Sequence, residues 1–269
     1  YKDCAAMSGR DGSGIAMGMR IGAKVEIATG GDMGSHAFIP LSPMEGIECL
    51  WLNKYGERYC NEAFGGPLLS GCAGAREPGD RAYLIWGGDW KEVFLNQLAG
   101  HLAPKEWDAE TVANMEATME AAIGSGAEGD DTSGKFLYCA DTLEELAELI
   151  EVDPAELKAT VERYNKLCKE GEDKDFYKEN HFLFPVEEGP FTACMVAPGL
   201  LAVCGGIHIS DNFEVLNEND EPIPGLYAVG LDATGLYGDS YNMEVPGAAN
   251  GFAHTSGRIA GRHFAAQLA

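Results

Sequence analysis

The sequence predicts a mixed α/β fold, and three observations support this class. Residues 142–150 and 153–171 carry the start and stop signals of amphipathic helices. Residues 190–230 consist of short β-rich runs separated by turn residues such as Asn219-Asp220. The end of the chain passes from a strand-like run through a glycine-rich stretch, 235–251, into a helix of small residues.

The first part of the chain is expected to alternate helix and strand. Residues 12–24, GSGIAMGMRIGAK, have apolar residues near helical spacing after a glycine turn. Residues 46–62 predict a hairpin, because two strand-like runs flank the turn NKYGE. Residues 81–86, RAYLIW, predict a strand, which a helix should follow from about Asp89.

The middle of the chain has the clearest helix signals. Residues 109–124 are helical by propensity, whereas 124–134 are rich in Gly, Ser and Asp and predict a loop. Thr142 as N-cap, with Glu145 three residues later, forms a capping box. The next helix should start at Asp153-Pro154, with Glu156 completing a second box, and should stop at Gly171.

The last part predicts a strand and a long helix. The run LYAVG indicates a buried strand that ends at Gly230. The helix that follows should span about 248–268. Its small residues would allow close packing on a sheet: Ala249, Ala253, Gly257, Ala260 and Gly261.

Composition excludes several classes of function. The 269 residues are 45% hydrophobic and 23% charged, as in soluble globular proteins, and the net charge is -24. Such acidity argues against nucleic-acid binding and against docking on anionic membranes. No run approaches about 18 apolar residues, so we expect no membrane insertion. The first residues show no signal peptide, and we expect a cytoplasmic protein, or one of the cell envelope if a removed upstream segment held a signal.

Eight cysteines bear on the redox environment. None has the C-x-x-C spacing of zinc or redox motifs, so no metal site is expected. Their even number permits disulfides, but a chain of this length does not need them. We expect reduced thiols and a reducing or anaerobic compartment.

Five motifs together resemble one family. IPGLYAVGLDATGLYGDSY followed by PGAANGFAHTSGRIAG is similar to the C-terminal end of the fumarate reductase/succinate dehydrogenase flavoprotein superfamily. Within it, the single-chain FAD-dependent reductases of anaerobic bacteria and the ketosteroid dehydrogenases resemble this chain most. Four further stretches match in register: DGSGIAMGMRIGA, LNKYGERYCNE, TVERYNKLCKEGEDKDFYK and CGGIHIS.

The resemblance implies an α+β capping domain inserted in a Rossmann-like FAD domain. Residues 1–37 and 196–269 would be FAD-domain segments, and 38–195 the capping, or substrate, domain. The family's N-terminal half holds the ADP part of FAD on a strand that leads into G-x-G-x-x-G, with a downstream acidic residue. We find no such strand-turn-helix element, so the chain is expected to be the C-terminal portion of the flavoprotein. Its partners would then be the missing N-terminal FAD-binding half or a separate subunit, and an external electron donor.

The same resemblance implies which residues approach the flavin. In the family, the last helix points its N-terminus at the flavin's pyrimidine carbonyl, which suits the free N–H groups and dipole of a helix start. Asp11 is an alternative to Ser13 as a flavin contact if the glycine turn is shifted. The residues at or beside the family's contact positions are Ser13, Gly205, Gly206, Asp232, Gly247, Ala249 and Asn250.

The substrate residues of fumarate reductases are not retained. The proton-donor arginine corresponds to Gly66, the histidine pair to Leu201 and Ala202, and the carboxylate-binding arginine to Tyr241. Fumarate and succinate are therefore not the expected substrates. A less anionic, unsaturated small molecule is expected.

Tyr241 is the catalytic residue that this comparison suggests. A phenol beside a flavin can polarise a carbonyl or deliver a proton, although it can also simply pack there. Tyr237 and Asp239 are nearby alternatives. His36 lies near the family's first substrate histidine and is a second catalytic candidate, or a structural one.

Two hypotheses of function follow. In the first, the chain is a portion of an FAD-dependent oxidoreductase that reduces or forms a C=C bond conjugated to a carbonyl, with hydride passing at flavin N5. In the second, it is a non-catalytic scaffold that does not bind FAD by itself.

Arg58 and Glu62, in the hairpin motif, are expected to be a salt bridge on a solvated face rather than catalytic.

Overall fold

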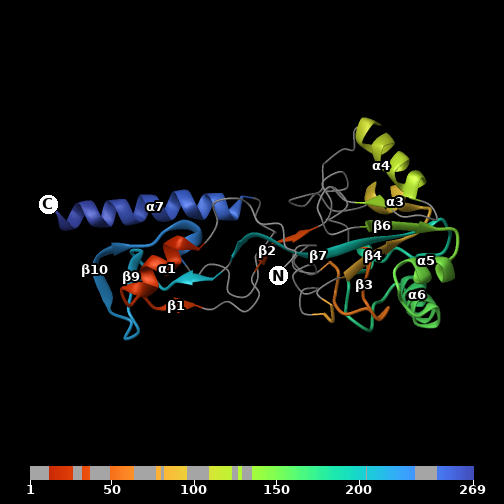
Figure 1. Ribbon diagram of the computed structural model, residues 1–269, viewed down its shortest axis with the longest axis horizontal. Coiled ribbons are helices and arrows are strands. Elements are labelled where there is room, and N and C mark those ends of the chain that lie inside the picture. Colours follow the sequence, from red (N-terminus) through yellow and green to blue (C-terminus); the bar gives the residue numbers. More distant parts are fainter. Residues whose placement is uncertain are drawn as a thin grey trace. The chain divides into compact units, whose positions relative to one another are not determined.

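The computed structural model describes residues 12–26, 32–36, 49–63, 77–79, 82–95, 109–122, 127–128, 135–203, 205–233 and 247–269 (Figure 1). The chain divides into two compact units. Among the described residues, one unit is drawn from 35–198 and the other from 6–34 and 199–269. We call them the capping unit and the terminal unit.

The capping unit is built on an antiparallel sheet with strand order β3-β4-β7-β6-β5. The central strand, β7, pairs with β4 and β6 and also with β2. The strands are β2 (Asp32–His36), β3 (Leu50–Asn53), β4 (Ala82–Trp86), β5 (Ala127–Glu128), β6 (Lys135–Ala140) and β7 (Phe191–Val203). The helices are α3 (Trp90–Leu95), α4 (Ala109–Ala122), α5 (Leu143–Leu149), α6 (Pro154–Glu170) and the 3-10 turn η2 (Asn180–Phe182).

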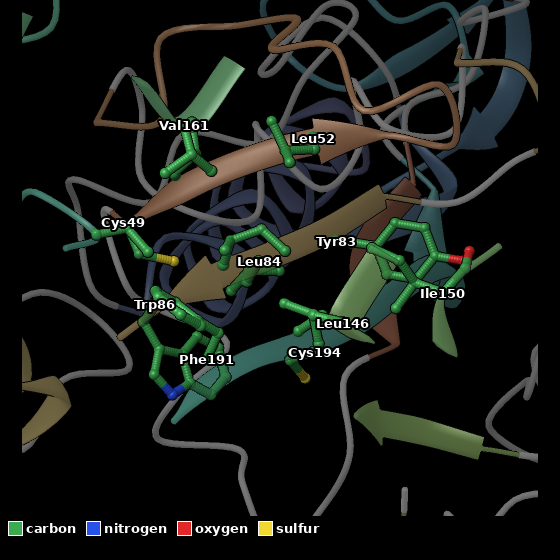
Figure 2. Close-up of a cluster of buried hydrophobic side chains, with 14 of the residues drawn as sticks. Cys49, Leu52, Tyr83, Leu84, Trp86, Leu146, Ile150, Val161, Phe191 and Cys194 are labelled. Carbon is green, nitrogen blue, oxygen red and sulfur yellow. The ribbon is translucent and has the colours of Figure 1, made fainter. Parts of the chain in front are cut away.

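A large apolar core holds this unit together. Every residue of β3 and β4 is buried. Figure 2 shows Leu84 and Trp86 of β4 among side chains of α5 and of β7, including Leu146 and Phe191. Such burial of large apolar side chains is the main favourable term in folding.

The terminal unit consists of smaller pieces. Strand β1 (Val25–Glu26) pairs with β8 (Gly206–Ile207), and β9 (Glu214–Leu216) pairs with β10 (Pro222–Tyr227). Helix α1 (Ser13–Arg20), the 3-10 turn η3 (Gly230–Asp232) and the long helix α7 (Ala248–Gln267) complete it (Figure 1). The buried core within its described residues is small: Ala23, Ile207, Val215, Ala228 and Ala233.

Most of the helix predictions are confirmed. The Thr142 hydroxyl accepts a hydrogen bond from the Glu145 amide at 3.2 Å, and the Asp153 carboxylate accepts one from the Ala155 amide at 2.8 Å. Gly171 ends α6 in the left-handed conformation that favours glycine. Gly12 opens α1 in the same conformation.

Three predictions differ from the structure. The hairpin predicted at 46–62 forms only in part. Its first arm is β3, its second arm is reduced to a single bridge from Arg58 to Leu52, and the main partner of β3 is β4. The strand predicted at LYAVG, ending at Gly230, is instead β10, which ends at Tyr227. None of the residues of β10 is buried, and its sheet has only two strands. The predicted loop 124–134 contains β5, which pairs with β6.

Two further findings concern the described residues alone. None of their helices combines the length and hydropathy needed to cross a membrane. The cysteines at 49, 60, 139, 168 and 194 form no disulfide.

Candidate functional site

The start of α1 forms one side of the candidate site. Gly12 has φ 70°, no side chain caps the helix, and no acidic residue occupies its first turn. A Cβ on Gly14 would lie 2.3 Å from an Asp232 carboxylate oxygen, so glycine is required there for Asp232 to lie against the helix. The chain therefore brings residues 12–14 together with a residue more than 200 positions later.

Strand β8 and η3 form the next side. Gly205 and Gly206 are buried, and a Cβ on Gly206 would lie 2.6 Å from the Asp232 backbone oxygen. Ile207 and Ala233 form a parallel bridge, which fixes this close approach. The two backbones are thus in van der Waals contact at Asp232.

Helix α7 is attached to the same place. The Ser256 hydroxyl accepts a hydrogen bond from the Gly230 amide at 3.0 Å and donates one to the Ala253 carbonyl at 3.1 Å. Gly247 starts α7 with φ 76°, again with no side-chain cap and no acidic residue in the first turn. Ala249 is partly buried and Asn250 is exposed.

This arrangement suits a ligand rich in hydrogen-bond acceptors. Two helices start on left-handed glycines without a side-chain acceptor at the cap, so their first-turn amides and positive dipole ends favour such a group. The Asp232 carboxylate adds an acceptor for hydroxyl groups. Amide donors for flavin carbonyls and a carboxylate for sugar-like hydroxyls are a donor set that fits the flavin part of FAD.

The structure brings together four of the seven residues expected at the flavin. Gly206 approaches Asp232 directly, and Ser13 and Gly205 are the chain neighbours of Gly14 and Gly206, the two glycines that lie against Asp232. The other three, Gly247, Ala249 and Asn250, lie in or beside the first turn of α7, the helix that η3 contacts.

The expected catalytic residues are not described in the same detail. His36 ends β2, but its side chain lies outside the described part of the chain. Tyr241 and its neighbours Tyr237 and Asp239 lie outside the described residues. Their roles stay predictions.

A second polar cluster lies in the capping unit and was misjudged from the sequence. Arg58 is not on a solvated face: its side chain is 6% exposed, and those of its partners Glu62 and Asp173 are 0% exposed. Four hydrogen bonds of 2.6–2.9 Å join the Arg58 guanidinium to the two carboxylates. Aromatic rings of Tyr164 and Phe176 lie about 5 Å from the guanidinium carbon.

Lys178 extends this cluster. Its buried Nζ atom donates to the Cys49 carbonyl and the Tyr164 hydroxyl, and lies 3.4 Å from Glu62. Asp173 also accepts the backbone amides of the turn that follows α6, at Asp175, Phe176 and Lys178. The cluster therefore ties β3 and the residues after it to the end of α6. It is a brace within one unit.

The pKa values of Asp173 and Arg58 are shifted in the directions that keep both groups charged. Burial would raise the pKa of Asp173, but hydrogen bonds from Arg58 and from backbone amides outweigh it and lower the pKa to about 2. Burial would lower the pKa of Arg58, but its hydrogen bonds to Glu62 and Asp173 raise it. Both groups stay charged in the folded protein.

One glycine pattern needs a correction. Residues 124–129, GSGAEG, also match the letters G-x-G-x-x-G. The pattern follows a helix, α4, and contains β5 at Ala127–Glu128. A dinucleotide-binding turn instead follows a strand and opens a helix. This stretch does not have that context. Within the described residues, no group of His, Cys, Asp and Glu side chains could hold a metal ion.

Comparison with known proteins gives a consistent set of similarities. The family model described as "FAD binding domain" matches residues 1–245. Vinyl phenol reductase of Lactiplantibacillus plantarum is 32% identical over 221 residues, which are 80% of this chain and 42% of that protein. Urocanate reductase of Eggerthella lenta is 38% identical over 117 residues, which are 44% of this chain and 18% of that protein.

A solved structure is similar in fold. The 3-ketosteroid delta1-dehydrogenase from Sterolibacterium denitrificans, in complex with 1,4-androstadiene-3,17-dione, superposes with a TM-score of 0.68 and 27% sequence identity. The match covers 95% of this chain and 47% of that one. The chain thus spans less than half of the length of each of these relatives.

Proposed function

The chain belongs to the FAD binding domain family, within the fumarate reductase/succinate dehydrogenase flavoprotein superfamily, and on that premise we propose that it is the flavin-side part of an FAD-dependent oxidoreductase acting on a C=C bond. The relatives named as reductases of vinyl phenol and urocanate, and as a ketosteroid dehydrogenase, support this reaction type. The finer proposal is a C=C bond conjugated to a carbonyl.

One observation carries the proposal: four segments far apart in the sequence converge on Asp232. Residues 12–14, 205–207 and 230–233 meet there, and Ser256 anchors α7 to the same turn. Close backbone approaches through glycine are typical of cofactor sites, because a side chain would fill the space that the neighbouring group needs.

In this proposal each part of the chain has a defined task. When bound, FAD supplies the chemistry of hydride transfer. The start of α7 points the positive end of its helix dipole at acceptor atoms and stabilises negative charge there. The Asp232 carboxylate accepts from hydroxyl groups and fixes the orientation of what it holds.

We further propose that Tyr241 serves the substrate. A phenol can donate to a carbonyl oxygen or hand a proton to carbon, and it replaces the arginine with which relatives of fumarate reductase grip a carboxylate. The neutral phenol favours a substrate with fewer negative charges than a dicarboxylate.

The ADP part of FAD needs a strand that enters a glycine-rich turn and then a helix, and the described residues contain no such element. We propose that it is supplied by polypeptide outside these 269 residues, either continuous with the chain or as a separate subunit. An external electron donor completes the reaction.

The test is to combine the chain with such an ADP-binding part and measure turnover with an enone as substrate. The proposal predicts turnover, and a fall in kcat/KM when Tyr241→Phe is introduced, with about 10²-fold as the scale for losing a general acid. Unchanged kcat/KM would remove Tyr241 from the mechanism.

The second candidate, a scaffold that binds no flavin, is favoured by one observation: the glycine pattern at 124–129 has the wrong structural context. The visible spectrum of the combined protein separates the two candidates. Flavin absorbance that survives gel filtration favours the oxidoreductase, and a colourless protein in excess FAD favours the scaffold.

A further inference from the structure

Phe213 has a backbone conformation that is unfavourable for its side chain. Its φ is 67°, in the left-handed region where the backbone crowds the Cβ of a bulky residue. Among the described residues, the other non-glycine residues with positive φ are all exposed: Glu151, Tyr177 and Asp220. Phe213 is 8% exposed, so its strain is held inside the terminal unit. Strain of this kind persists only where the surroundings impose it, and it is concentrated at functional sites.

The turn that contains Phe213 does not need an aromatic side chain. The Phe213 amide donates to the Ser210 carbonyl at 2.9 Å, and the Ser210 amide donates to the Glu214 carbonyl at 2.9 Å. The Ser210 hydroxyl accepts the amides of Asn212 and Glu214, at 3.3 and 3.2 Å. None of these bonds uses the ring of Phe213, so glycine or asparagine would close the same turn with less strain. The contacts of the ring must therefore explain why phenylalanine stands here.

The backbone of Phe213 is joined to the chain just before η3. Its carbonyl accepts a hydrogen bond from the Ala228 amide at 3.1 Å. Ala228 is buried and lies two residues before η3, the turn that contains Asp232. The Asp232 backbone in turn lies against Gly206 of β8. The place of Phe213 therefore bears directly on the place of η3.

The ring of Phe213 contacts a second segment of the candidate site. Its centroid lies 5.9 Å from that of Phe252, and the two rings are tilted by 51°, which is a favourable arrangement for an aromatic pair. Phe252 follows Gly247, the glycine at the start of α7, by five residues.

No other buried aromatic side chain lies in the described part of the terminal unit, whose core cluster is made of alanine, valine and isoleucine. Removal of the ring would therefore leave a space that these small neighbours fill poorly.

We propose that Phe213 is a positioning residue: its strained backbone places the ring where it holds η3, and with it the Asp232 carboxylate, at a fixed place in the flavin site. This rests on the proposed function, in which Asp232 fixes the orientation of the group that it holds. Phe213 acts through η3 and not by chemistry of its own. Glycine or asparagine would relieve the strain but would leave the place of the ring empty.

The first measurement is hydrogen exchange in the combined two-part protein before FAD is added. The Gly230 amide, bonded to the Ser256 hydroxyl at 3.0 Å, reports on η3. The Lys24 amide, bonded to the Leu216 carbonyl at 2.9 Å, reports on the strands of the same unit. The ratio of the two exchange rates separates loosening of η3 from loss of stability in the whole unit.

Three variants are compared with a matched control. Phe213→Asn removes the ring and suits a left-handed backbone, and Phe213→Tyr keeps the ring. Phe213→Leu keeps apolar bulk without the ring, and it covers the case in which Phe213→Asn does not fold. The control, Val215→Ala, removes apolar bulk from a residue of the same core that is 0% exposed.

The proposal predicts that Phe213→Asn raises the exchange rate at Gly230 about tenfold or more relative to that at Lys24, whereas Val215→Ala raises both rates alike. With FAD added, Phe213→Asn should weaken FAD binding about tenfold and alter the visible spectrum of the bound flavin. Phe213→Leu should show the same effects to a smaller extent, and Phe213→Tyr should change FAD binding less than about threefold.

An unchanged exchange ratio in Phe213→Asn and Phe213→Leu would overturn the proposal, and so would an equal change of the ratio in Val215→Ala. A changed ratio with unaltered FAD affinity and flavin spectrum would also overturn it, because Phe213 would then only pack.

The outcome is separable from that of the proposed function. A combined protein that binds no FAD contradicts the oxidoreductase, and the exchange ratio, measured without FAD, still decides whether Phe213 holds η3. If Phe213→Asn leaves FAD affinity and turnover with an enone unchanged, the positioning role is contradicted and the oxidoreductase stands.

Discussion

Replacing Arg58 with methionine should destabilise the capping unit more than any exposed ion-pair mutation. Methionine keeps much of the apolar stem between the rings of Tyr164 and Phe176 but removes the guanidinium. Two carboxylates that are 0% exposed, those of Glu62 and Asp173, then lose the four hydrogen bonds that neutralise them. Breaking one side of a buried pair costs about 3–5 kcal/mol.

The matched control is Arg163→Met. Arg163 makes the same two-point contact with Asp175, at 2.6 and 2.9 Å, but the two side chains are 47% and 32% exposed. An exposed pair contributes about 0–1 kcal/mol. The two variants therefore differ in burial while sharing the chemistry of the ion pair.

Urea unfolding followed by tryptophan fluorescence measures the difference, because Trp51 and Trp86 are buried in the core of this unit. Arg58→Met should lower the free energy of unfolding by about 3–5 kcal/mol, and Arg163→Met by less than about 1 kcal/mol. If the two variants fall within about 0.5 kcal/mol of each other, burial does not set the worth of this cluster and the reasoning fails.

Three further predictions concern acid stability, the site and a helix cap. The pKa of Asp173 is held at about 2, below its ordinary 3.8, so its contribution to stability is complete above pH 3.8 and is lost as pH falls through 2. Asp173→Asn should therefore flatten the curve of unfolding free energy against pH in this range. An unaltered curve would contradict the prediction. Gly206→Ala should destabilise the terminal unit by about 1–3 kcal/mol in a hydrogen-exchange measurement, since the new methyl group would lie 2.6 Å from a backbone oxygen. Gly225 lies in open space at φ 77°, so the same measurement on Gly225→Ala tests backbone strain separately. Asp153→Ala should cost about 1 kcal/mol of unfolding free energy through loss of the cap on Ala155, and Asp153→Asn should restore most of it.

The sequence predicted best those features that depend on residues close together in the chain, such as helix caps. The caps at Thr142 and Asp153 and the stop at Gly171 depend on residues two to four positions away, so their chemistry is visible in the sequence itself. The glycine starts of α1 and α7 are of the same kind, which is why the beginnings of these two helices could be predicted.

Long-range contacts were not visible. Arg58 and Glu62 have the spacing of an ordinary exposed pair, and the partner that shows them to be buried, Asp173, is 115 residues from Arg58. The charged run after α6 likewise contains two buried residues, Asp173 and Lys178. Burial is a property of the tertiary fold, and local pattern does not encode it.

The same limit applies to the last helix. Its small residues indicated packing on a sheet, and the structure shows Ala260 buried but Gly257 and Gly261 open. Phe264 on the same helix packs against the ring of Tyr227 in β10.

The central claim is that this chain supplies the flavin-side half of an oxidoreductase acting on C=C bonds. The most direct test is to reduce the flavin of the combined two-part protein chemically, mix it anaerobically with an enone, and follow flavin reoxidation by absorbance. The account predicts reoxidation that requires both the enone and this chain. Reoxidation at the same rate without this chain, or none with any conjugated substrate, would contradict it.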